Sequence, residues 1–356
     1  MNSRDIASTD ERILVTGSNG FIGSKVVEKL LDYDFANLRC FVRPSSNLAR
    51  LHNALAKFNA GRNVELVTGD LLSPEDCANA AEGVSVIYHL AAGMEKSFAG
   101  AFMNSALTSR NLMDAFLRYG QQKRFVNVSS FAVYSNLGLK RGALLDESYP
   151  LEDAPQERFD PYGFGKLKQE EVVRGYGSRY KLPYVILRPG YVFGPGKREL
   201  NARVGIDTFG VFIQVSGSNR LPLTFVDNCA EAIVLAGLKP GIEGEVFNVV
   251  DDKLLTGRQF LKSYKNRIKP FRSVRIPYSL AYAMCIFWEK YSKWSKNQLP
   301  PVFNRRRCAA QWKKMRYSNQ KLKDRLGWKP RVPMNEAMDA FLSQFESNGN
   351  DYQLKG

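Results

Sequence analysis

The chain has few of the residues that bind metal ions or form disulfides. His52 and His89 are its only histidines, which argues against histidine-rich metal chemistry, and we expect no bound metal. The cysteines are odd in number and widely scattered. Their spacing fits neither a disulfide framework nor a zinc site, but it does fit a reducing compartment. They are Cys40, Cys77, Cys229, Cys285 and Cys308.

Long apolar runs are missing as well. The start, MNSRDIASTDER, is polar and mixed in charge, without the apolar segment of a secretory signal peptide. Elsewhere no run reaches the roughly 18 apolar residues that a membrane-spanning helix needs. These features predict a cytoplasmic protein and leave open a location at the inner face of a membrane.

Acidic residues are scarce in the C-terminal third. Between Lys253 and Arg331 there are 22 Lys and Arg against only Glu289 and Asp324, whereas the whole chain of 356 residues has a net charge of +16. The segregated charge indicates an anionic partner: a phosphorylated substrate, an acidic membrane surface or nucleic acid. A solvated basic face without a ligand is the alternative. Because no recognisable nucleic-acid-binding module accompanies the charge, we expect no nucleic acid partner.

Short apolar runs alternate with amphipathic stretches in the first half of the chain. Such alternation predicts an α/β protein with a doubly wound parallel sheet, the Rossmann fold. From about residue 251 the chain is mainly helical and basic. The runs with strand character lie at 13–17, 38–42, 64–70, 84–92, 124–130, 184–190 and 245–250, with a shorter one at 224–227. Helical periodicity is present at 21–33, 48–58 and 103–119.

This pattern predicts two domains and two tails. Residues 11–190 with 223–250 form an NAD(P)-binding Rossmann domain. Residues 191–222 with 251–346 form a smaller, mainly helical substrate-binding domain. We expect residues 1–10 and 347–356 to be flexible tails.

The glycines of TGSNGFIG follow the first strand and open the first helix. In this position Gly17, Gly20 and Gly23 permit a tight turn, close approach of a pyrophosphate and packing of the helix on the strand. The N-terminus of the helix then offers free N–H groups to phosphates. The motif predicts a dinucleotide-binding loop, with a purely structural glycine turn as the alternative.

The end of the second strand bears on the choice of cofactor. An NAD site would place an acid here for the ribose hydroxyls, but the residue is Arg43, followed by Ser45 and Ser46. That set suits a 2′-phosphate, so we expect NADP(H) in preference to NAD(H). Asp70 and Leu71, after the third strand, would lie beside the adenine.

A proton-transfer pair is indicated by DPYGFGK at 160–166. Tyr162 and Lys166 lie four residues apart on one helical face, and Ser130 follows the fifth strand. Reduction of a carbonyl requires a hydride, which the cofactor handles, and a proton. We expect a nearby ammonium and the nicotinamide charge to lower the pKa of the phenol, which makes Tyr162 the acid/base. A helix start without chemistry is the alternative.

These residues together resemble the extended short-chain dehydrogenase/reductase family, the NAD(P)-dependent epimerase/dehydratase group. The resemblance covers almost the entire chain in the expected order. It rests on TGSNGFIG, GDLLSPED, YHLAA, NSALT, VSSFAVYS, YGFGK, LRPGYVFGPG, FVDN and LGWKPRVPMNEAM. It implies that Ser130, Tyr162 and Lys166 are catalytic, with support from Asn104. The implied cofactor-binding residues are Gly17, Ser18, Asn19, Gly20, Phe21, Ile22, Gly23, Arg43, Ser46, Asp70, Leu71, Leu90, Ala91, Ala92, Tyr162, Lys166 and Pro189.

Three departures from the family pattern narrow the reaction. Phe131 and Ala132 stand where the dehydratases carry an Asp–Glu pair, which argues against dehydration. Arg220 is out of register with the Arg–Asp pair of many sugar-nucleotide enzymes, which argues against a plain UDP-sugar substrate. Gly165 replaces the Ser usual before the lysine, a change that we expect to leave the proton relay intact.

The C-terminal region resembles 3β-hydroxysteroid dehydrogenase-like enzymes and relatives that epimerise sugars on polyprenyl diphosphate. The segment 275–296 has an apolar front half followed by aromatics and lysines. Two readings stay open: 276–316 contacts an acidic membrane peripherally, or the helix packs on the substrate domain.

The leading function is an NADP-dependent oxidoreductase for a secondary alcohol or ketone. The preferred substrate is an anionic small molecule, a sugar linked to a nucleotide or lipid diphosphate. The alternatives are a sugar 4-epimerase, a 3β-hydroxysteroid-type dehydrogenase and a non-catalytic NADP sensor or scaffold. The family resemblance also admits a homodimer.

Overall fold

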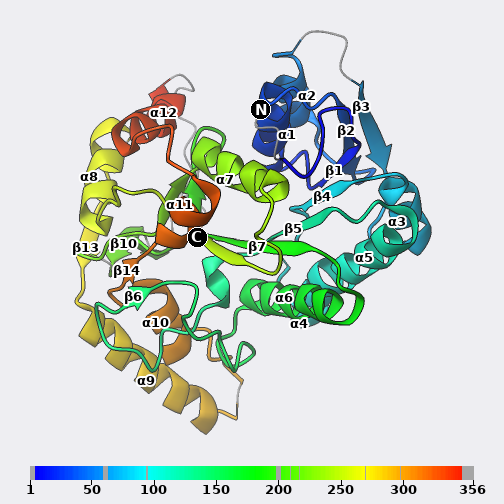
Figure 1. Ribbon diagram of the computed structural model, residues 1–356. Helices are drawn as coiled ribbons and strands as arrows, with labels where there is room; N and C mark the ends of the chain where they lie inside the picture. Colours follow the sequence, from blue (N-terminus) through cyan, green and yellow to red (C-terminus); the bar gives the residue numbers. More distant parts are fainter. Residues whose placement is uncertain are drawn as a thin grey trace.

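A parallel sheet of seven strands forms the centre of the computed structural model, in the order β12-β7-β5-β4-β1-β2-β3 (Figure 1). The structure describes residues 5–58, 63–93, 95–197, 202–208, 210–215, 217–268, 270–296 and 298–346. The strands are β1 (Ile13–Thr16), β2 (Asn37–Val42), β3 (Asn63–Thr68), β4 (Val86–His89), β5 (Arg124–Val128), β7 (Tyr184–Pro189) and β12 (Val246–Val249). This sheet confirms the predicted doubly wound fold.

Helices cover both faces of the sheet and bury a separate core on each. Figure 1 shows α1, α2 and α7 on one side and α3, α5 and α6 on the other. The helices pack through apolar stripes; in α1 the residues Val26, Val27 and Leu30 are fully buried. The helices are α1 (Gly23–Asp32), α2 (Ala49–Leu55), α3 (Pro74–Ala81), α5 (Thr108–Tyr119), α6 (Pro161–Tyr180) and α7 (Val226–Leu238).

The strand order reverses between β1 and β4. The chain winds from β1 to β2 and β3 in one direction, then crosses to β4 and continues to β5, β7 and β12 in the other. In open parallel sheets the crevice at such a reversal, outside the carboxyl ends of the strands, is where ligands bind. The fold therefore places the ends of β1, β4 and β5 around one candidate site.

The helix predicted at 103–119 is not α-helical throughout. After α4 (Phe98–Ala101) the chain forms a π-helical segment, Phe102–Leu107, and only then α5. This segment packs closely on α6, where a Cβ at Gly165 would lie 2.9 Å from the Ala101 carbonyl oxygen and 3.0 Å from Ser105 Oγ. The glycine that departs from the family pattern thus has a steric reason.

The C-terminal part is smaller and mainly helical, as predicted, and its short strands form small sheets outside the central one. The run at 224–227 lies outside the central sheet, because β11 (Leu223–Phe225) pairs with β8 (Tyr191–Phe193). The other strands are β6 (Leu144–Leu145), β9 (Gly205–Thr208), β10 (Val211–Gln214), β13 (Ser273–Arg275) and β14 (Arg316–Tyr317). The helices are α8 (Gly257–Arg267), α9 (Tyr278–Trp294), α10 (Arg305–Trp312), α11 (Gln320–Leu326) and α12 (Met334–Glu346).

The segment 1–10, predicted to be a flexible tail, is partly held against α7. The Ile6 N–H donates to the Leu238 carbonyl at 3.0 Å, and Ala7 is buried. Residues 5–10 are therefore anchored at the end of α7. The rest of the tail prediction, residues 1–4 and 347–356, lies outside the described residues.

Candidate functional site

The glycine-rich loop after β1 is too crowded for side chains. Gly17 has φ of 68°, and a Cβ there would lie 2.9 Å from the Ala91 backbone nitrogen. A Cβ at Gly23 would overlap the Gly17 carbonyl oxygen. No side chain caps the N-terminus of α1, and its first turn carries no acid. Residues 17–23 thus form a bare backbone cradle that fits a pyrophosphate.

A tight turn follows β2 and presents the residues predicted to choose the cofactor. The Arg43 N–H donates to Ser46 Oγ at 3.1 Å, and the Ser46 N–H donates to the Arg43 carbonyl at 2.9 Å. Arg43 is exposed, and the Ser46 hydroxyl keeps its proton for a further acceptor. This turn suits an anion.

The remaining predicted cofactor residues lie at the ends of neighbouring strands. After β3, Asp70 Oδ1 accepts from the Leu72 N–H at 2.9 Å, and Leu71 is buried. After β4, the Leu90 N–H donates to the Thr16 carbonyl at 3.2 Å, which holds residues 90–92 against the glycine loop. Pro189 ends β7 on the far side of β5.

Ser130 and Tyr162 meet at the end of β5. Ser130 caps the 3₁₀ turn Phe131–Val133, with its Oγ accepting the Ala132 N–H at 3.1 Å. α6 begins at Pro161, and its N-cap Asp160 accepts the Gly163 N–H at 3.0 Å, which fixes the first turn that carries Tyr162. The Ser130 side chain lies close enough to the Tyr162 phenol to lower the pKa of that phenol.

The pKa of Tyr162 lies above the ordinary value for a phenol. Burial raises it, Asp160 raises it further, and the Ser130 side chain offsets only part of the rise. Lys166 is not among the groups that act on the phenol. The lowering of the phenol pKa by the Lys166 ammonium and the nicotinamide charge stays a prediction; in the structure Lys166 Nζ is directed to other partners.

Lys166 is buried beneath the site. Its Nζ donates to the Val128 carbonyl at 2.6 Å and to Gln169 Oε1 at 2.9 Å. Burial lowers the pKa of Lys166 to about 7, although the nearby Glu170 carboxylate favours the charged form. Burial thus weakens the preference of Lys166 for its charged form.

A line of buried side chains connects Lys166 with the glycine loop. Gln169 Nε2 donates to Ser109 Oγ at 2.9 Å. Ser109 Oγ lies 2.8 Å from His89 Nε2, and His89 Nδ1 lies 2.8 Å from Thr16 Oγ1. The line ends on Thr16, directly before Gly17.

The direction of these hydrogen bonds can be assigned. Ser109 spends its only proton on the Ser105 carbonyl at 2.6 Å, so it must accept from His89 Nε2–H. His89 Nδ1 then accepts the Thr16 hydroxyl proton. A neutral ring fits, because burial and then Lys166 lower the pKa of His89 to about 3. His89 is buried, and it orders the end of β1.

A buried ion pair holds the strand end on which Ser130 sits. Glu170 accepts from Arg188 Nε at 2.8 Å and Nη2 at 2.6 Å, and also from Ser129 Oγ at 2.6 Å. Arg188 Nη1 donates to the Tyr134 hydroxyl at 2.9 Å. The pair therefore joins α6, β5 and β7 around the candidate catalytic serine.

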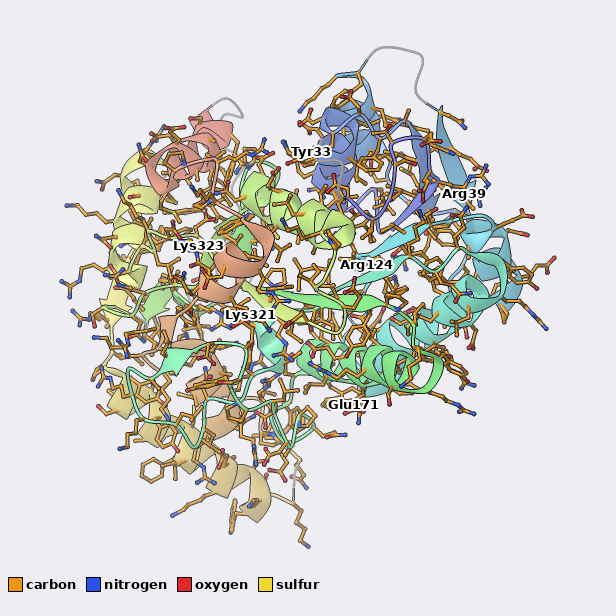
Figure 2. The ribbon with its side chains drawn as sticks, viewed as in Figure 1. Tyr33, Arg39, Arg124, Glu171, Lys321 and Lys323 are labelled. Carbon is orange, nitrogen blue, oxygen red and sulfur yellow. The ribbon has the colours of Figure 1, made fainter. Side chains whose placement is uncertain are left out.

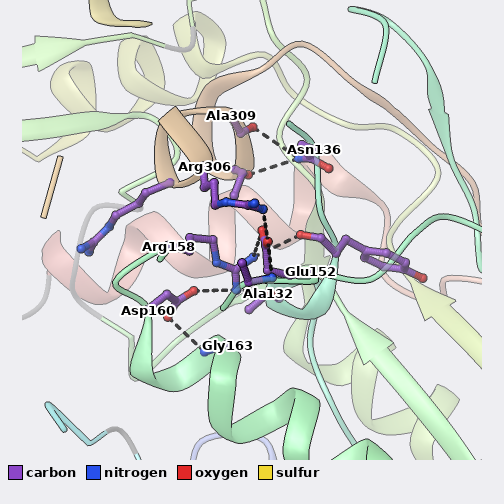
Figure 3. A network of polar contacts seen from close by, with 12 residues as sticks. Ala132, Asn136, Glu152, Arg158, Asp160, Gly163, Arg306 and Ala309 are labelled. Atoms are coloured by element: carbon purple, nitrogen blue, oxygen red, sulfur yellow. Dashed lines mark hydrogen bonds and ion pairs between the residues drawn. The ribbon is translucent and has the colours of Figure 1, made fainter. Parts of the chain in front are cut away.

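A second network, the Arg158 network, fixes the start of α6 (Figure 3). It consists of Arg158 with Glu152, Asp160 and Arg306. The Arg158 guanidinium donates to the Ala132 carbonyl and lies 2.9 Å from Asp160 Oδ2 and 3.7 Å from Glu152 Oε2. Arg306 of α10 reaches the same Glu152 at 2.6 Å. The C-terminal part is thereby tied to the turn that positions Tyr162.

Asn104 lies on the π-helical segment. Its Nδ2 donates to Glu95 Oε1 at 2.9 Å, beside the loop that follows β4. π-Helical turns often occur at functional sites. Support of the site by Asn104 stays a prediction.

Several residues that shape the site were not identified from the sequence. Gln169 and Glu170 follow Lys166 by one turn of α6, so helical spacing could have indicated them. Arg158 and Arg188 gave no local signal, because their partners are contributed by distant segments.

Several cations of the basic C-terminal third are paired with carboxylates of the same chain. Lys321 and Lys323 of α11 lie near the centre of the structure (Figure 2), where they pair with Glu245 at 2.6 Å and Asp252 at 2.6 Å. Further pairs join Arg305 to Glu289, Arg306 to Glu152, Asp153 and Glu157, Arg325 to Glu245, and Arg331 to Glu231. These six of the 22 Lys and Arg of the segment therefore hold the C-terminal part together and to the acidic remainder.

Among the described residues, no three His, Cys, Asp or Glu side chains come together as a metal site. The five cysteines are free and buried. Within the same ranges no helix is long and apolar enough to cross a membrane.

Comparison with known proteins gives consistent results. An uncharacterized UDP-glucose epimerase of Bacillus subtilis (YtcB) is 29% identical over 67% of this chain and 76% of its own length. The 3β-hydroxysteroid-dehydrogenase/decarboxylase isoform 1 of Arabidopsis thaliana is 25% identical over 96% of this chain and 81% of its own. The fold is similar to UDP-glucuronic acid 4-epimerase of Bacillus cereus in complex with NAD, with TM-score 0.69, 22% identity, and coverage of 94% and 99%.

The model of the NAD dependent epimerase/dehydratase family matches residues 13–249, which includes the glycine loop, Ser130, Tyr162 and Lys166. The chain is therefore an enzyme of this family, an extended short-chain dehydrogenase/reductase, as its motifs indicated.

Proposed function

We propose that this enzyme transfers a hydride between a nicotinamide dinucleotide and a secondary alcohol or ketone, with Tyr162 moving the proton. One observation carries the proposal. Tyr162 lies beside Ser130 at the carboxyl end of β5, where the serine side chain favours the phenolate, and only β4 separates that strand from the one that ends in the glycine loop.

The residues around the crevice have separate roles. Residues 17–23 would hold the pyrophosphate, Arg43 and Ser46 the adenosine end, and residues 90–92 the middle of the dinucleotide. When bound, the dinucleotide supplies or accepts the hydride. During reduction Tyr162 donates its phenolic proton to the substrate oxygen, and during oxidation it takes that proton back. Ser130 holds the same oxygen and stabilises the phenolate.

We propose that residues 191–222 with 251–346 bind the substrate, an anionic small molecule such as a sugar linked to a diphosphate. The epimerases of B. subtilis and B. cereus carry UDP-sugars in their names, and the C-terminal third of this chain is strongly basic. A 4-epimerase is the second candidate, favoured by the same relatives. It would use the same residues and return the hydride to the opposite face of the sugar.

One experiment separates these functions. Purified enzyme is incubated with UDP-hexoses, keto-sugars and 3-hydroxysterols, while reduced cofactor is followed by absorbance and products by mass spectrometry. Net change of cofactor that matches product supports the oxidoreductase. Interconversion of sugars without net change, with a nucleotide that co-purifies, supports the epimerase. A protein that binds neither NADPH nor NADH overturns both.

The preference for NADP(H) can be tested at Arg43. Arg43→Glu should lower the affinity ratio of NADPH to NADH at least about tenfold, because a 2′-phosphate would lose a charge-assisted contact worth ~1.5 to 3 kcal/mol and meet a carboxylate. Both affinities can be measured by quenching of protein fluorescence. Lys140→Glu makes the same charge change on an exposed residue of the loop before β6 and should leave the ratio unchanged. An unchanged ratio in Arg43→Glu would remove Arg43 from cofactor selection.

A further inference from the structure

α9 lies at the edge of the molecule and is covered on one side only (Figure 1). Its inner face packs through Ala281 and Cys285 against Cys308 and Trp312 of α10. Of the residues on α9, Ala281, Cys285 and Ser292 are buried.

The outer face of α9 carries an apolar stripe, formed by Leu280, Met284, Phe287, Tyr291 and Trp294. Their spacing of four and three residues places them on one face of the helix. Phe287 is 73% exposed and Trp294 is 79% exposed, the largest values among the exposed large hydrophobic residues of the described chain.

The loop after α9 extends this surface. Leu299, Val302 and Phe303 are also exposed. The loop is tied to the helix, because Trp288 Nε1 donates to the Pro300 carbonyl at 3.2 Å and the Trp288 ring lies 6.2 Å from that of Phe303. Helix and loop together form a contiguous apolar surface of the kind that marks an interaction site.

Uncompensated cations border this surface. Lys290, Lys293 and Lys296 are exposed, and no carboxylate of the described residues lies within ion-pair distance of them. The single acid of the helix, Glu289, is already paired with Arg305 at 2.7 Å. These three lysines therefore differ from the cations of α10 and α11, many of which are neutralised inside the molecule.

We propose that α9 binds the surface of an anionic lipid bilayer, with the apolar stripe between the headgroups and the three lysines on the phosphates. α9 has 17 residues, and no described helix is long and apolar enough to cross a membrane, so it would lie in the plane of the interface. Tyr291 and Trp294 combine an apolar ring with a polar atom, which suits this depth. The surface potential of anionic lipids attracts lysines at such positions.

The charge distribution favours a lipid surface over a second copy of this chain. A second copy of this helix would bring the same three lysines and no unpaired acid of its own to the contact. Glu289 could not compensate them, because Arg305 occupies it. An anionic bilayer instead supplies the missing negative charge. The proposal concerns a surface remote in sequence from Tyr162, and it holds or fails independently of the reaction.

Vesicle flotation tests the contact with the full-length protein. We expect binding to vesicles of phosphatidylcholine with about 30% phosphatidylglycerol, and much weaker binding to pure phosphatidylcholine. Binding should fall as salt rises, because screening weakens the lysine contribution. Equal binding to both vesicles, or to neither, overturns the proposal.

Two variants separate the apolar and the charged parts. Phe287→Ser with Trp294→Ser should lower binding at least roughly a hundredfold, from the loss of two inserted rings. Lys290→Gln with Lys293→Gln and Lys296→Gln should cost a similar factor on anionic vesicles, at about fivefold per lysine. Tyr119→Ser and Tyr180→Ser remove exposed rings elsewhere and should leave binding unchanged. Equal losses in these controls contradict a specific surface.

A spectroscopic readout does not depend on affinity. Trp294 should move to an apolar environment, so anionic vesicles should shift the protein's tryptophan emission to shorter wavelength. The Trp294→Phe variant should still bind the vesicles but lose most of that shift. Analytical ultracentrifugation without lipid measures the oligomeric state and so tests the opposing outcome. A stable dimer that the Phe287→Ser, Trp294→Ser variant dissociates, together with no vesicle binding, would assign the surface to self-association and overturn the lipid proposal.

Discussion

Replacing Tyr162 with Phe is expected to lower turnover at least roughly a hundredfold, the lower end of general acid–base contributions, with little change in dinucleotide affinity. The variant keeps the ring that fills the space between α6 and Ser130 and removes only the oxygen that carries the proton. The measurement compares kcat on the substrate found for the wild type with NADPH and NADH affinity from fluorescence quenching.

A second tyrosine of α6 serves as the matched control. Tyr176 donates its hydroxyl to Asp114 Oδ1 at 2.5 Å on the outer part of the helix, away from the carboxyl end of β5. Tyr176→Phe makes the same chemical change, and kcat should stay within about twofold of the wild type. If Tyr162→Phe retains most of its turnover, another group must move the proton, and the proposed reaction loses its central observation.

Glu170→Gln is expected to lower the free energy of unfolding by about 3 kcal/mol. Removing one partner of a buried ion pair leaves the other charge uncompensated, and Arg188 would keep its burial without its carboxylate. Burial raises the pKa of Glu170, but the hydrogen bonds and charge of Arg188 outweigh burial, so the net shift is downward. The stabilisation of the pair should therefore be complete above the ordinary carboxyl pKa and lost as pH falls through the lowered one.

The neighbouring Glu171 provides the control. It lies on the outer side of α6 (Figure 2), 61% exposed, where it pairs with Lys168 at 2.7 Å. Glu171→Gln should cost no more than about 0.5 kcal/mol, because surface pairs contribute little. Urea unfolding of both variants at neutral pH gives the comparison. Equal and small effects would show that the Glu170–Arg188 pair does not stabilise the sheet end.

The sheet could be predicted from the sequence because its signals are local. Runs such as 13–17 and 184–190 are apolar, β-branched and bounded by turn residues, and each is a strand of the central sheet. Gly17 and Gly23 could be predicted for the same reason, since their role depends on the adjoining strand and helix alone. The placement of Ser130, Tyr162 and Lys166 could be predicted next, because in a doubly wound sheet the carboxyl ends of the strands lie at one edge.

The chemistry beneath the site could not be predicted, because it depends on contacts between distant segments. Helical spacing placed Lys166 near Tyr162, but only the fold shows its Nζ directed to Val128 and Gln169. The π-helical turn at Phe102–Leu107 likewise has no signature in an amphipathic pattern.

Composition alone also could not show which cations of the basic C-terminal third are paired within the chain. Its net charge was correct, but ion pairs such as Arg306 with Glu152 and Lys321 with Glu245 link residues many positions apart in the sequence. Among the cations that these pairs leave without a carboxylate, Lys290, Lys293 and Lys296 are the ones on or next to the helix that carries the exposed apolar stripe.

The Arg158 network also constrains how the enzyme can move. Glu152 contacts Arg158 beside the start of α6 and Arg306 of α10, so a hinge that opened the C-terminal part at this seam would expose a buried carboxylate and a buried guanidinium (Figure 3). Closure by a swinging lid is therefore disfavoured on this side. This side of the enzyme would stay fixed while substrate enters. Any segment that moves to admit substrate would lie across the crevice.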